Sequence, residues 1–345
     1  MLRFAIPSKG NGYDGAVRLL ESLGLGISRA NARQYTARMR GLPDTEVLLH
    51  RPEDIVDKVA YGSIDIGITG LDIVHENRED DENLLIIYED LGFWGVDLVF
   101  AAPQAWIDVS SWQDLADLSI ELQGQGRPLR IATKYPNLVR RFCYCHGINV
   151  FRLIPSAGAT EAAPGLGYAD IIADITETGT ALRDNQLKVV GGVILHSQAC
   201  LVGSKRSLKH HAGRLELVRQ VLELMEARQN GHKLYSLTAN VPGDLVEAVG
   251  QQVMRLPELA GLQGPTIAPV WNKHAPGADE AASAASEGAG WYEIHVIVPQ
   301  KALLPATDHL RSIGASSVSA IPVQYTFYAE SSVYRRLLEM LNEAG

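Results

Sequence analysis

Short apolar runs alternate with stretches of helical periodicity over the first two-thirds of the chain. The apolar runs are rich in Val, Ile and Leu and lack clean alternation, which is typical of strands buried on both faces. They predict strands over Leu2–Ile6, Glu46–Leu49, Ile64–Thr69, Leu84–Asp90, Val96–Ala101, Arg130–Thr133, Asn149–Leu153, Ala169–Ile175, Val189–Leu195 and Ala199–Gly203. The helical stretches are Gly15–Leu23, Pro52–Ala60, Asn137–Cys145 and Glu177–Asn185. This alternation predicts an α/β architecture with largely parallel sheets.

A polar break over residues 110–127 divides the predicted strands into two groups. We therefore expect a two-lobed core, with residues 1–95 and 190–230 in lobe I and residues 96–189 in lobe II. Strand C-termini and helix N-termini converge between two such lobes, which favours a ligand site there.

The pattern changes after a charged amphipathic helix over Leu208–Asn230. Strands are predicted at Lys233–Val241, Pro265–Val270, Trp291–Val298 and Ser317–Pro322, with helices at Asp244–Leu256 and Leu303–Ile313. This β-α-β-β-α-β order predicts a ferredoxin-like α+β domain over residues 231–330. Its segment 272–290 is dominated by Ala, Gly, Ser and Glu, which indicates a flexible hairpin insertion. A last helix is expected over Ser331–Asn342, within residues 331–345.

Composition narrows the functional classes. A length of 345 residues favours more than one domain, and the formal net charge of -9 disfavours a nucleic-acid or anionic-membrane surface. We expect a cytoplasmic protein, because no secretion signal and no membrane-spanning apolar stretch is apparent. The spacing of Cys143 and Cys145 suits neither a metal knuckle nor a redox pair, so reduced thiols are expected at the three cysteines. His75, His146 and His196 have no metal spacing with acids or cysteines, so no protein-bound zinc is expected.

The junction after the strand Ala169–Ile175 has the features of an anion-binding loop. Gly179 permits a sharp bend and close approach of a ligand, while Thr176, Thr178 and Thr180 supply hydroxyls at the start of a helix. The alternative is that Thr176 or Thr178 merely caps this helix. The nearby acids Asp170 and Asp174 favour a ribose phosphate, whose hydroxyls carboxylates bind directly or through a divalent metal.

The segment from Glu161 to Leu182 resembles the signature of the ATP phosphoribosyltransferase family, long form. It has the expected glutamate, both aspartates and the Thr-Gly-x-x-Leu ending, but Ala181 replaces the usual threonine. Segments that agree with the family are residues 65–70, 130–137, 197–201, 264–269 and 313–317. The resemblance implies a periplasmic-binding-protein-like two-lobed catalytic core followed by the ferredoxin-like regulatory domain.

The resemblance also implies a reaction. Phosphoribosyl pyrophosphate would donate its phosphoribosyl group to N1 of ATP in the first step of histidine biosynthesis, with Mg²⁺ carried by the pyrophosphate near Asp174 and not by dedicated protein ligands. The phosphoribosyl pyrophosphate site would comprise Asp174, Thr176, Glu177, Thr178, Gly179, Thr180, Ala181 and Leu182. Catalytic roles would fall to Asp174, Glu177 and Lys9.

The ATP side is assigned by resemblance to Lys9, Gly10, Asn11, Arg51, Asp90 and Glu161. Arg51 and Lys134 are candidates for contacts in the cleft, with solvated surface charge as the alternative, and the same alternative holds for Lys9. Asn11 and Asp97 stand where the family usually has arginine. One hypothesis is that these two positions lie close together and changed together.

The C-terminal domain implies control by histidine, bound between subunits of a homo-oligomer ranging from dimer to hexamer. Candidate contacts are Thr238, Thr266, Ala315 and Ser316, with ordinary strand packing as the alternative. Two other functional classes stay open from sequence. One is a two-lobed small-anion binding or sensor protein, and the other is a catalytically weakened regulatory homologue, suggested by Asn11 and Asp97.

Overall fold

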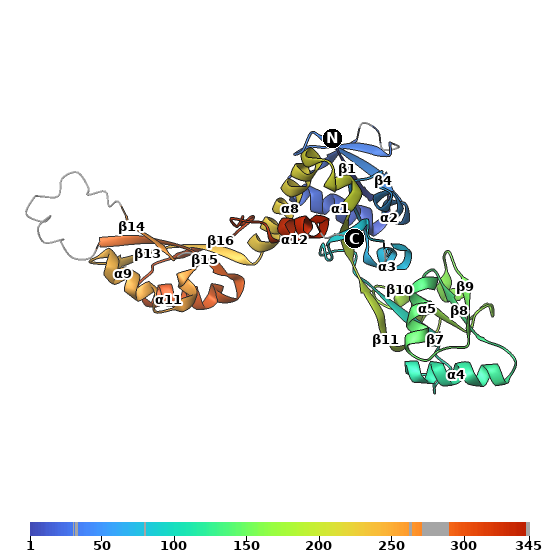
Figure 1. Ribbon diagram of the computed structural model, residues 1–345. Coiled ribbons are helices and arrows are strands. Elements are labelled where there is room, and N and C mark those ends of the chain that lie inside the picture. The colour runs from blue at the N-terminus through green and yellow to red at the C-terminus, as the bar shows by residue number, and fades with distance from the viewer. Residues whose placement is uncertain (30, 32–33, 79–80, 262–263, 271–289, 343–345) are drawn as a thin grey trace, which may run out of the picture. The chain divides into compact units, whose positions relative to one another are not determined.

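The computed structural model describes residues 1–29, 31, 34–78, 81–261, 264–270 and 290–342. The chain divides into two compact units (Figure 1). The first comprises Met1–Gln220 together with the segment from Val333 onward, and the second comprises Val221–Ser332. The first unit contains two sheets and the second contains one.

The first sheet forms the core of lobe I and has the strand order β2-β3-β4-β1-β5-β12-β6. Its strands are β1 (Leu2–Pro7), β2 (Ile27–Ser28), β3 (Thr36–Met39), β4 (Thr45–His50), β5 (Ile66–Gly70), β6 (Leu84–Tyr88) and β12 (Ala199–Ser204). β1 runs parallel to β4 and β5, whereas β12 is antiparallel to β5 and β6. Central strands such as β5 are buried along their whole length, as the unbroken apolar runs predicted.

Helices α1 (Gly10–Ser22), α2 (Pro52–Ala60) and α3 (Leu71–Arg78) follow β1, β4 and β5. α2 begins as predicted, with Pro52 in the first turn and the acids Glu53 and Asp54 beside the helix N-terminus. The helix α7 (Lys205–Lys209) and all but the first residue of α12 (Ser332–Asn342) also belong to this unit. The helix α8 (Ala212–Gly231) begins here and runs into the second unit.

The second sheet forms lobe II and has the order β11-β7-β10-β8-β9. Its strands are β7 (Val96–Pro103), β8 (Leu129–Thr133), β9 (Phe151–Pro155), β10 (Ile171–Thr176) and β11 (Leu187–Ser197). β8 is parallel to β9 and β10, but β7 is antiparallel to both of its neighbours. Both sheets are therefore mixed, and the expectation of largely parallel sheets holds only for β4-β1-β5 in the first and β10-β8-β9 in the second.

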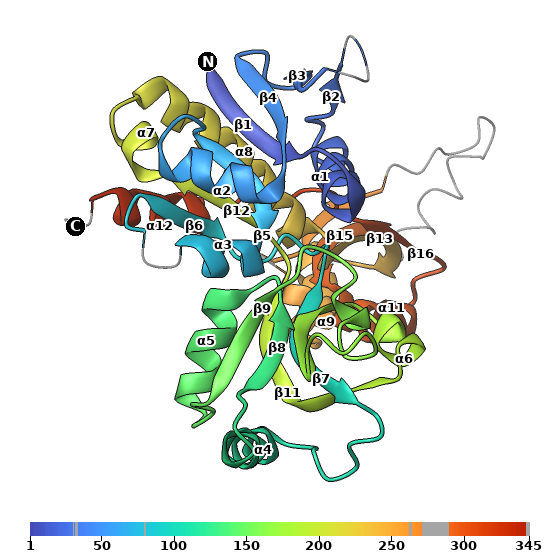
Figure 2. The same cartoon turned by 90° about the vertical axis from the view of Figure 1, so that its right-hand side faces the viewer.

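Lobe II differs from the sequence prediction in two places. The predicted polar break at 110–127 contains the helix α4 (Trp112–Gly124), which starts with a capping box formed by Ser111 and Asp114. The predicted return to lobe I at residue 190 is too early, because β11 pairs with β7 as far as Ser197. The other helices of this lobe are α5 (Pro136–Cys145), α6 (Thr180–Asp184) and a single 3-10 turn at Thr160–Ala162. Figure 2 shows α3 and α5 side by side where the two lobes meet.

The second unit has the order β13 (Leu234–Gly243), α9 (Val246–Val253), β14 (Thr266–Pro269), β15 (Gly290–Pro299), α11 (Leu303–Ser312) and β16 (Val318–Pro322), with short 3-10 turns at Pro257–Ala260 and Gln300–Ala302. All neighbours in its sheet, β14-β15-β13-β16, are antiparallel. This confirms the ferredoxin-like prediction. Apart from Gly290, which begins β15, the predicted insertion 272–290 lies outside the described residues.

Candidate active site

The predicted anion loop connects β10 to α6. Gly179 adopts a left-handed conformation with φ 70°, which favours glycine over any residue with a Cβ atom. Its backbone N–H donates to Oγ1 of Thr176 at 2.9 Å. The N-cap of α6 is Gly179 itself, and no side chain caps the helix. Neither Thr176 nor Thr178 is thus the N-cap residue, although Thr176 accepts the N–H of the residue that is.

The hydroxyls of this loop are grouped on its exposed side. Oγ1 of Thr178 lies 2.9 Å from Oγ1 of Thr180, and both residues are exposed. The guanidinium of Arg183 donates to the carbonyl of Thr178 and to Oγ1 of Thr180, each at 3.1 Å. Arg183 was not predicted as a site residue, although its position in the short helix directly after a Thr-Gly-Thr sequence was a usable signal. It places a positive charge beside the hydroxyls, which suits an anionic ligand.

Asp174 lies immediately before the loop and is half-buried. Burial raises the pKa of its carboxyl group, and the neighbouring charge of Glu161 acts in the same direction. Hydrogen bonds from the Ile175 N–H, at 2.8 Å, and from the Thr160 hydroxyl oppose that rise, as does the charge of Lys134. The structure thus brings two predicted acids and the candidate lysine into one neighbourhood.

Asp170 has a different role. It lies before the first residue of β10, is only 7% exposed, and forms ion pairs with Arg127 and Arg130 at 2.9 Å each. The backbone N–H of Arg130 also donates to its carboxylate at 2.8 Å. Burial alone would raise the pKa of this carboxyl, but the bonds from the two arginines leave it lowered. Asp170 therefore anchors β8 to β10 and has no capacity left for sugar hydroxyls.

Lys134 follows β8 and forms an ion pair at 2.9 Å with Glu53, in the first turn of α2. The pair joins the two lobes, and both side chains are about half exposed, at 50% and 41%. Glu53 was missed as a site residue because a first-turn acid is explained by the helix dipole alone. Arg51, a predicted ATP contact, is the exposed N-cap residue of the same helix.

The remaining residues assigned to the ATP side lie on exposed turns. Lys9 is the N-cap residue of α1, and Gly10 follows it with φ 73°. Asn11 is exposed in the first turn of that helix. Asp90 accepts the backbone N–H of Gly92 at 2.7 Å, which stabilises a turn. Among the described residues, no hydrogen bond or ion pair joins these four to the loop.

Oδ1 of Asp97 lies within hydrogen-bond distance of Nδ1 of His196, at 2.7 Å, and the two residues are register partners on β7 and β11. The adjacent residues Phe93 and Trp94 pack against glycines of α1, Gly15 and Gly12. The hypothesis that Asn11 and Asp97 lie together stays a prediction, although this packing brings their segments near each other.

In the second unit, Thr238 and Thr266 are both register partners of His295, on opposite sides of β15. Nε2 of His295 lies 2.8 Å from Oγ of Ser236. Ala315 and Ser316 lie in the turn before β16. The two threonines are thus brought near one histidine side chain that sequence reasoning did not single out.

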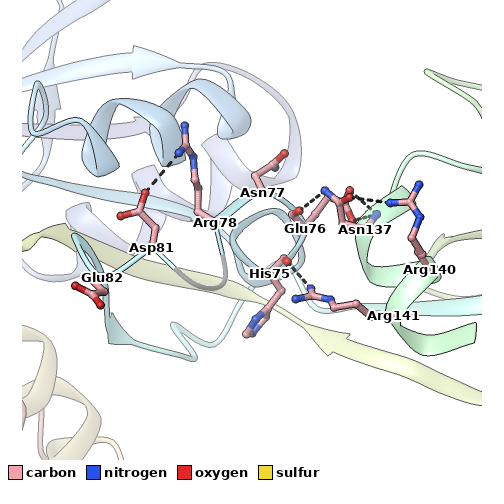
Figure 3. Close-up of a pocket in the computed structure, with 9 residues that line it drawn as sticks. All are labelled: His75, Glu76, Asn77, Arg78, Asp81, Glu82, Asn137, Arg140 and Arg141. Carbon is pink, nitrogen blue, oxygen red and sulfur yellow. Dashed lines mark hydrogen bonds and ion pairs between the residues drawn. The ribbon is translucent and has the colours of Figure 1, made fainter. Parts of the chain in front are cut away.

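A cavity of about 720 Å³ lies between α3 and α5 (Figure 3). Its lining residues are His75, Glu76, Asn77, Arg78, Asp81, Glu82, Asn137, Arg140 and Arg141, and none of them was predicted as a site residue. Several of these charged side chains already have partners within the protein. Arg78 forms ion pairs with Asp57 and Asp81, and Glu76 accepts backbone N–H groups of α5.

Over the part of the chain that the structure describes, no three His, Cys, Asp or Glu side chains are arranged to hold a metal ion. No described helix is long and apolar enough to cross a membrane.

The two-lobed α/β unit thus carries a hydroxyl-rich loop with an adjacent arginine, and two carboxylates and a lysine lie nearby. Comparisons with known proteins name the family. The family model described as ATP phosphoribosyltransferase matches residues 51–227, and that described as HisG, C-terminal domain, matches residues 232–325.

Relatives match over almost the whole chain. ATP phosphoribosyltransferase 2, chloroplastic, of Arabidopsis thaliana is 39% identical over 99% of this chain and 80% of its own length. The ATP phosphoribosyltransferase of a Bradyrhizobium species is 34% identical over 97% of each chain. A solved ATP phosphoribosyl transferase (HisG:HisZ) complex from Thermotoga maritima contains a chain 27% identical, with a TM-score of 0.48, covering 66% of this chain and 99% of that chain. The chain belongs to the ATP phosphoribosyltransferase family, in its long form, and its function is the first step of histidine biosynthesis.

Proposed function

We propose that the loop 174–182 holds phosphoribosyl pyrophosphate while N1 of ATP attacks the anomeric carbon, giving phosphoribosyl-ATP and pyrophosphate. The observation that supports this assignment best is the exposed hydroxyl pair of Thr178 and Thr180, held by Arg183 beside the left-handed Gly179. This arrangement offers neutral and charged donors to a 5′-phosphate without moving the backbone.

Asp174 and Glu177 would hold the ribose hydroxyls. A carboxylate also stabilises the positive charge that develops on the ring as the bond to pyrophosphate breaks. Glu161, which acts electrostatically on Asp174, would complete this side of the site. The chain then works mainly by aligning the attacking nitrogen with the anomeric carbon, and no side-chain nucleophile is needed.

The donor chemistry near Asp174 fits Mg²⁺, which prefers carboxylate, phosphate and water oxygens. When bound to the pyrophosphate, Mg²⁺ would neutralise charge on the leaving group. The contribution of the chain is to supply cations that bind the anionic substrate, and Lys134 and Lys9 are the candidates.

The second unit would bind histidine near Thr238 and Thr266, with Ala315 and Ser316 on the adjoining turn, and would lower activity by favouring one assembly of a homo-oligomer between dimer and hexamer. Such control requires that histidine bind two states of the enzyme with different affinity. We further propose a cytoplasmic location. The Arabidopsis relative is named chloroplastic, and that description applies to the relative.

A turnover assay tests the proposal. The protein is mixed with ATP, phosphoribosyl pyrophosphate and Mg²⁺ in the presence of pyrophosphatase, and phosphoribosyl-ATP is followed by its absorbance. The proposal is supported if phosphoribosyl-ATP forms, if its formation stops when Mg²⁺ is chelated, and if the rate falls when histidine is added. Tight binding of one substrate without product would instead support a catalytically weakened homologue, as the departures at Asn11 and Asp97 suggested.

A further inference from the structure

A buried carboxylate joins three segments at the junction of the lobes. Asp72, on α3 of lobe I, is 4% exposed, and its Oδ2 accepts the phenolic O–H of Tyr135 from lobe II at 2.7 Å. Its Oδ1 accepts the hydroxyl of Ser197, the last residue of β11, also at 2.7 Å. The backbone N–H of Asp72 donates to the same serine oxygen at 2.9 Å.

These bonds leave Asp72 little freedom. A charged carboxylate removed from water is tolerated only where donors replace the lost hydration, and here two hydroxyls do so. Burial raises the pKa of the Tyr135 phenol, and the charge of Asp72 adds to the rise. The phenol thus remains protonated and keeps donating to the carboxylate. Tyr135 is itself only 2% exposed, so its ring is held in one position.

The anchored ring fixes the residue before it. Lys134 lies between Thr133, the end of β8, and Tyr135, whose backbone N–H donates to Oγ1 of Thr133 at 2.9 Å. The backbone of Lys134 is therefore restrained on both sides. Its ammonium reaches Glu53 at 2.9 Å, and its charge also acts on the carboxyl of Asp174.

We propose that Asp72 is a positioning residue that acts through Tyr135 to hold Lys134 beside Asp174, where the ammonium meets the anionic substrate. This proposal rests on the proposed function, which places phosphoribosyl pyrophosphate at Asp174. Asp72 touches no substrate in this account. Its contribution is to restrain Lys134 already in the free enzyme. Less conformational entropy is then lost at Lys134 when the substrate binds.

The experiment is steady-state kinetics of Tyr135→Phe, which removes one hydroxyl and keeps the buried ring. The KM for phosphoribosyl pyrophosphate should rise about tenfold with kcat changed by less than about twofold, because a lost contact that serves binding alone raises KM. In a Lys134→Ala background, Tyr135→Phe should raise this KM by less than about twofold, because its effect depends on the Lys134 side chain. Tyr144→Phe is the matched control, because it makes the same chemical change on the exposed side of α5.

A KM that stays at the wild-type value in Tyr135→Phe overturns the positioning role, and so does a tenfold effect that persists in the Lys134→Ala background. Asp72→Asn provides a second variant that keeps the side-chain shape, and it should show the same suppression by Lys134→Ala. Wild-type enzyme is assayed first. Absence of phosphoribosyl-ATP there contradicts the proposed function, whereas normal wild-type turnover with an unaffected Tyr135→Phe contradicts only the role of Asp72.

Discussion

The carboxylate of Glu76 on α3 caps the neighbouring helix α5 by accepting the backbone N–H of Asn137, at 2.9 Å to Oε1 and 3.1 Å to Oε2 (Figure 3). The N–H of Leu138 donates to the same carboxylate at 2.9 Å. Donors that a helix N-terminus usually offers to an anion are thus satisfied by an acid from the other lobe. This favours the loop after β10, and not the start of α5, as the phosphate site.

Glu76→Ala should destabilise the first unit by about 1–2 kcal/mol, because buried N–H groups at a helix start lose their acceptor. Urea unfolding followed by circular dichroism measures the change. Glu82→Ala provides the control, since Glu82 lines the same cavity but is exposed. Equal stability of the two variants would contradict the capping role.

Gly179→Ala should weaken binding of phosphoribosyl pyrophosphate. A Cβ atom is strained at φ 70°, and it would lie 3.2 Å from Nη1 of Arg183, so both the turn and the arginine must shift. Calorimetric titration measures the loss, which we expect to be about tenfold. Gly124→Ala, at the end of α4 with open space around the added methyl, should bind as wild type does. Unchanged affinity in Gly179→Ala would remove the need for the left-handed turn.

The pH dependence of phosphoribosyl pyrophosphate binding reports on Asp174. Its pKa is raised from 3.8 by burial and by Glu161, so binding should fail on the acid side at a pH above the ordinary aspartate value. Glu161→Gln removes a negative charge near Asp174, so the pH below which binding is lost should move lower. Lys134→Ala should move it to higher pH, because Lys134 lowers the same pKa. Shifts in the opposite directions would exclude Asp174 as the titrating group.

Asp65 should contribute to the acid stability of lobe I. It is fully buried, and its carboxylate accepts bonds from Arg3 and Arg214 at 2.9 Å and from the Ser207 hydroxyl. Although burial raises its pKa, the bonds from Arg3 and Ser207 lower it below 3.8. Since the folded-state pKa is depressed, its stabilisation is present above the unfolded value and is lost as pH falls through the folded value.

Asp65→Asn should therefore lower the free energy of unfolding at neutral pH by about 3 kcal/mol, because it leaves two arginines without their buried partner. The loss should shrink as the pH is lowered below 3.8, where the wild-type carboxyl becomes protonated. Urea unfolding at a series of pH values measures both effects. A constant difference between variant and wild type down to the acid transition would contradict this account.

Local patterns were sufficient for much of the fold and for the loop. The Thr-Gly-Thr sequence after an apolar strand predicted the turn at Gly179, because glycine adopts the left-handed backbone conformation without steric strain. The helix α3 was missed because it is buried around most of its surface, including Asp72 and Glu76, so no amphipathic stripe marks it. The helix α4 was missed although Ser111 and Asp114 have capping-box spacing.

Side-chain pairings between the lobes were beyond the reach of sequence. Lys134 and Glu53 are 81 positions apart, and Tyr135 and Asp72 are 63 apart, so no local periodicity links them. At Asp170, sequence reasoning suggested a ligand contact, but the structure shows internal ion pairs. Its position in an acidic strand favoured a sugar contact, whereas in the fold two arginines saturate it.

The central claim is that the loop 174–182 binds the 5′-phosphate of phosphoribosyl pyrophosphate. Isothermal titration of phosphoribosyl pyrophosphate with Mg²⁺ into Thr180→Glu tests it most directly, with Thr307→Glu, on α11 of the second unit, as the control. We predict that the Thr180 variant loses more than about 100-fold in affinity, because a carboxylate placed among the donors repels the phosphate, whereas the control binds like wild type. Wild-type affinity in Thr180→Glu would contradict the assignment of this loop.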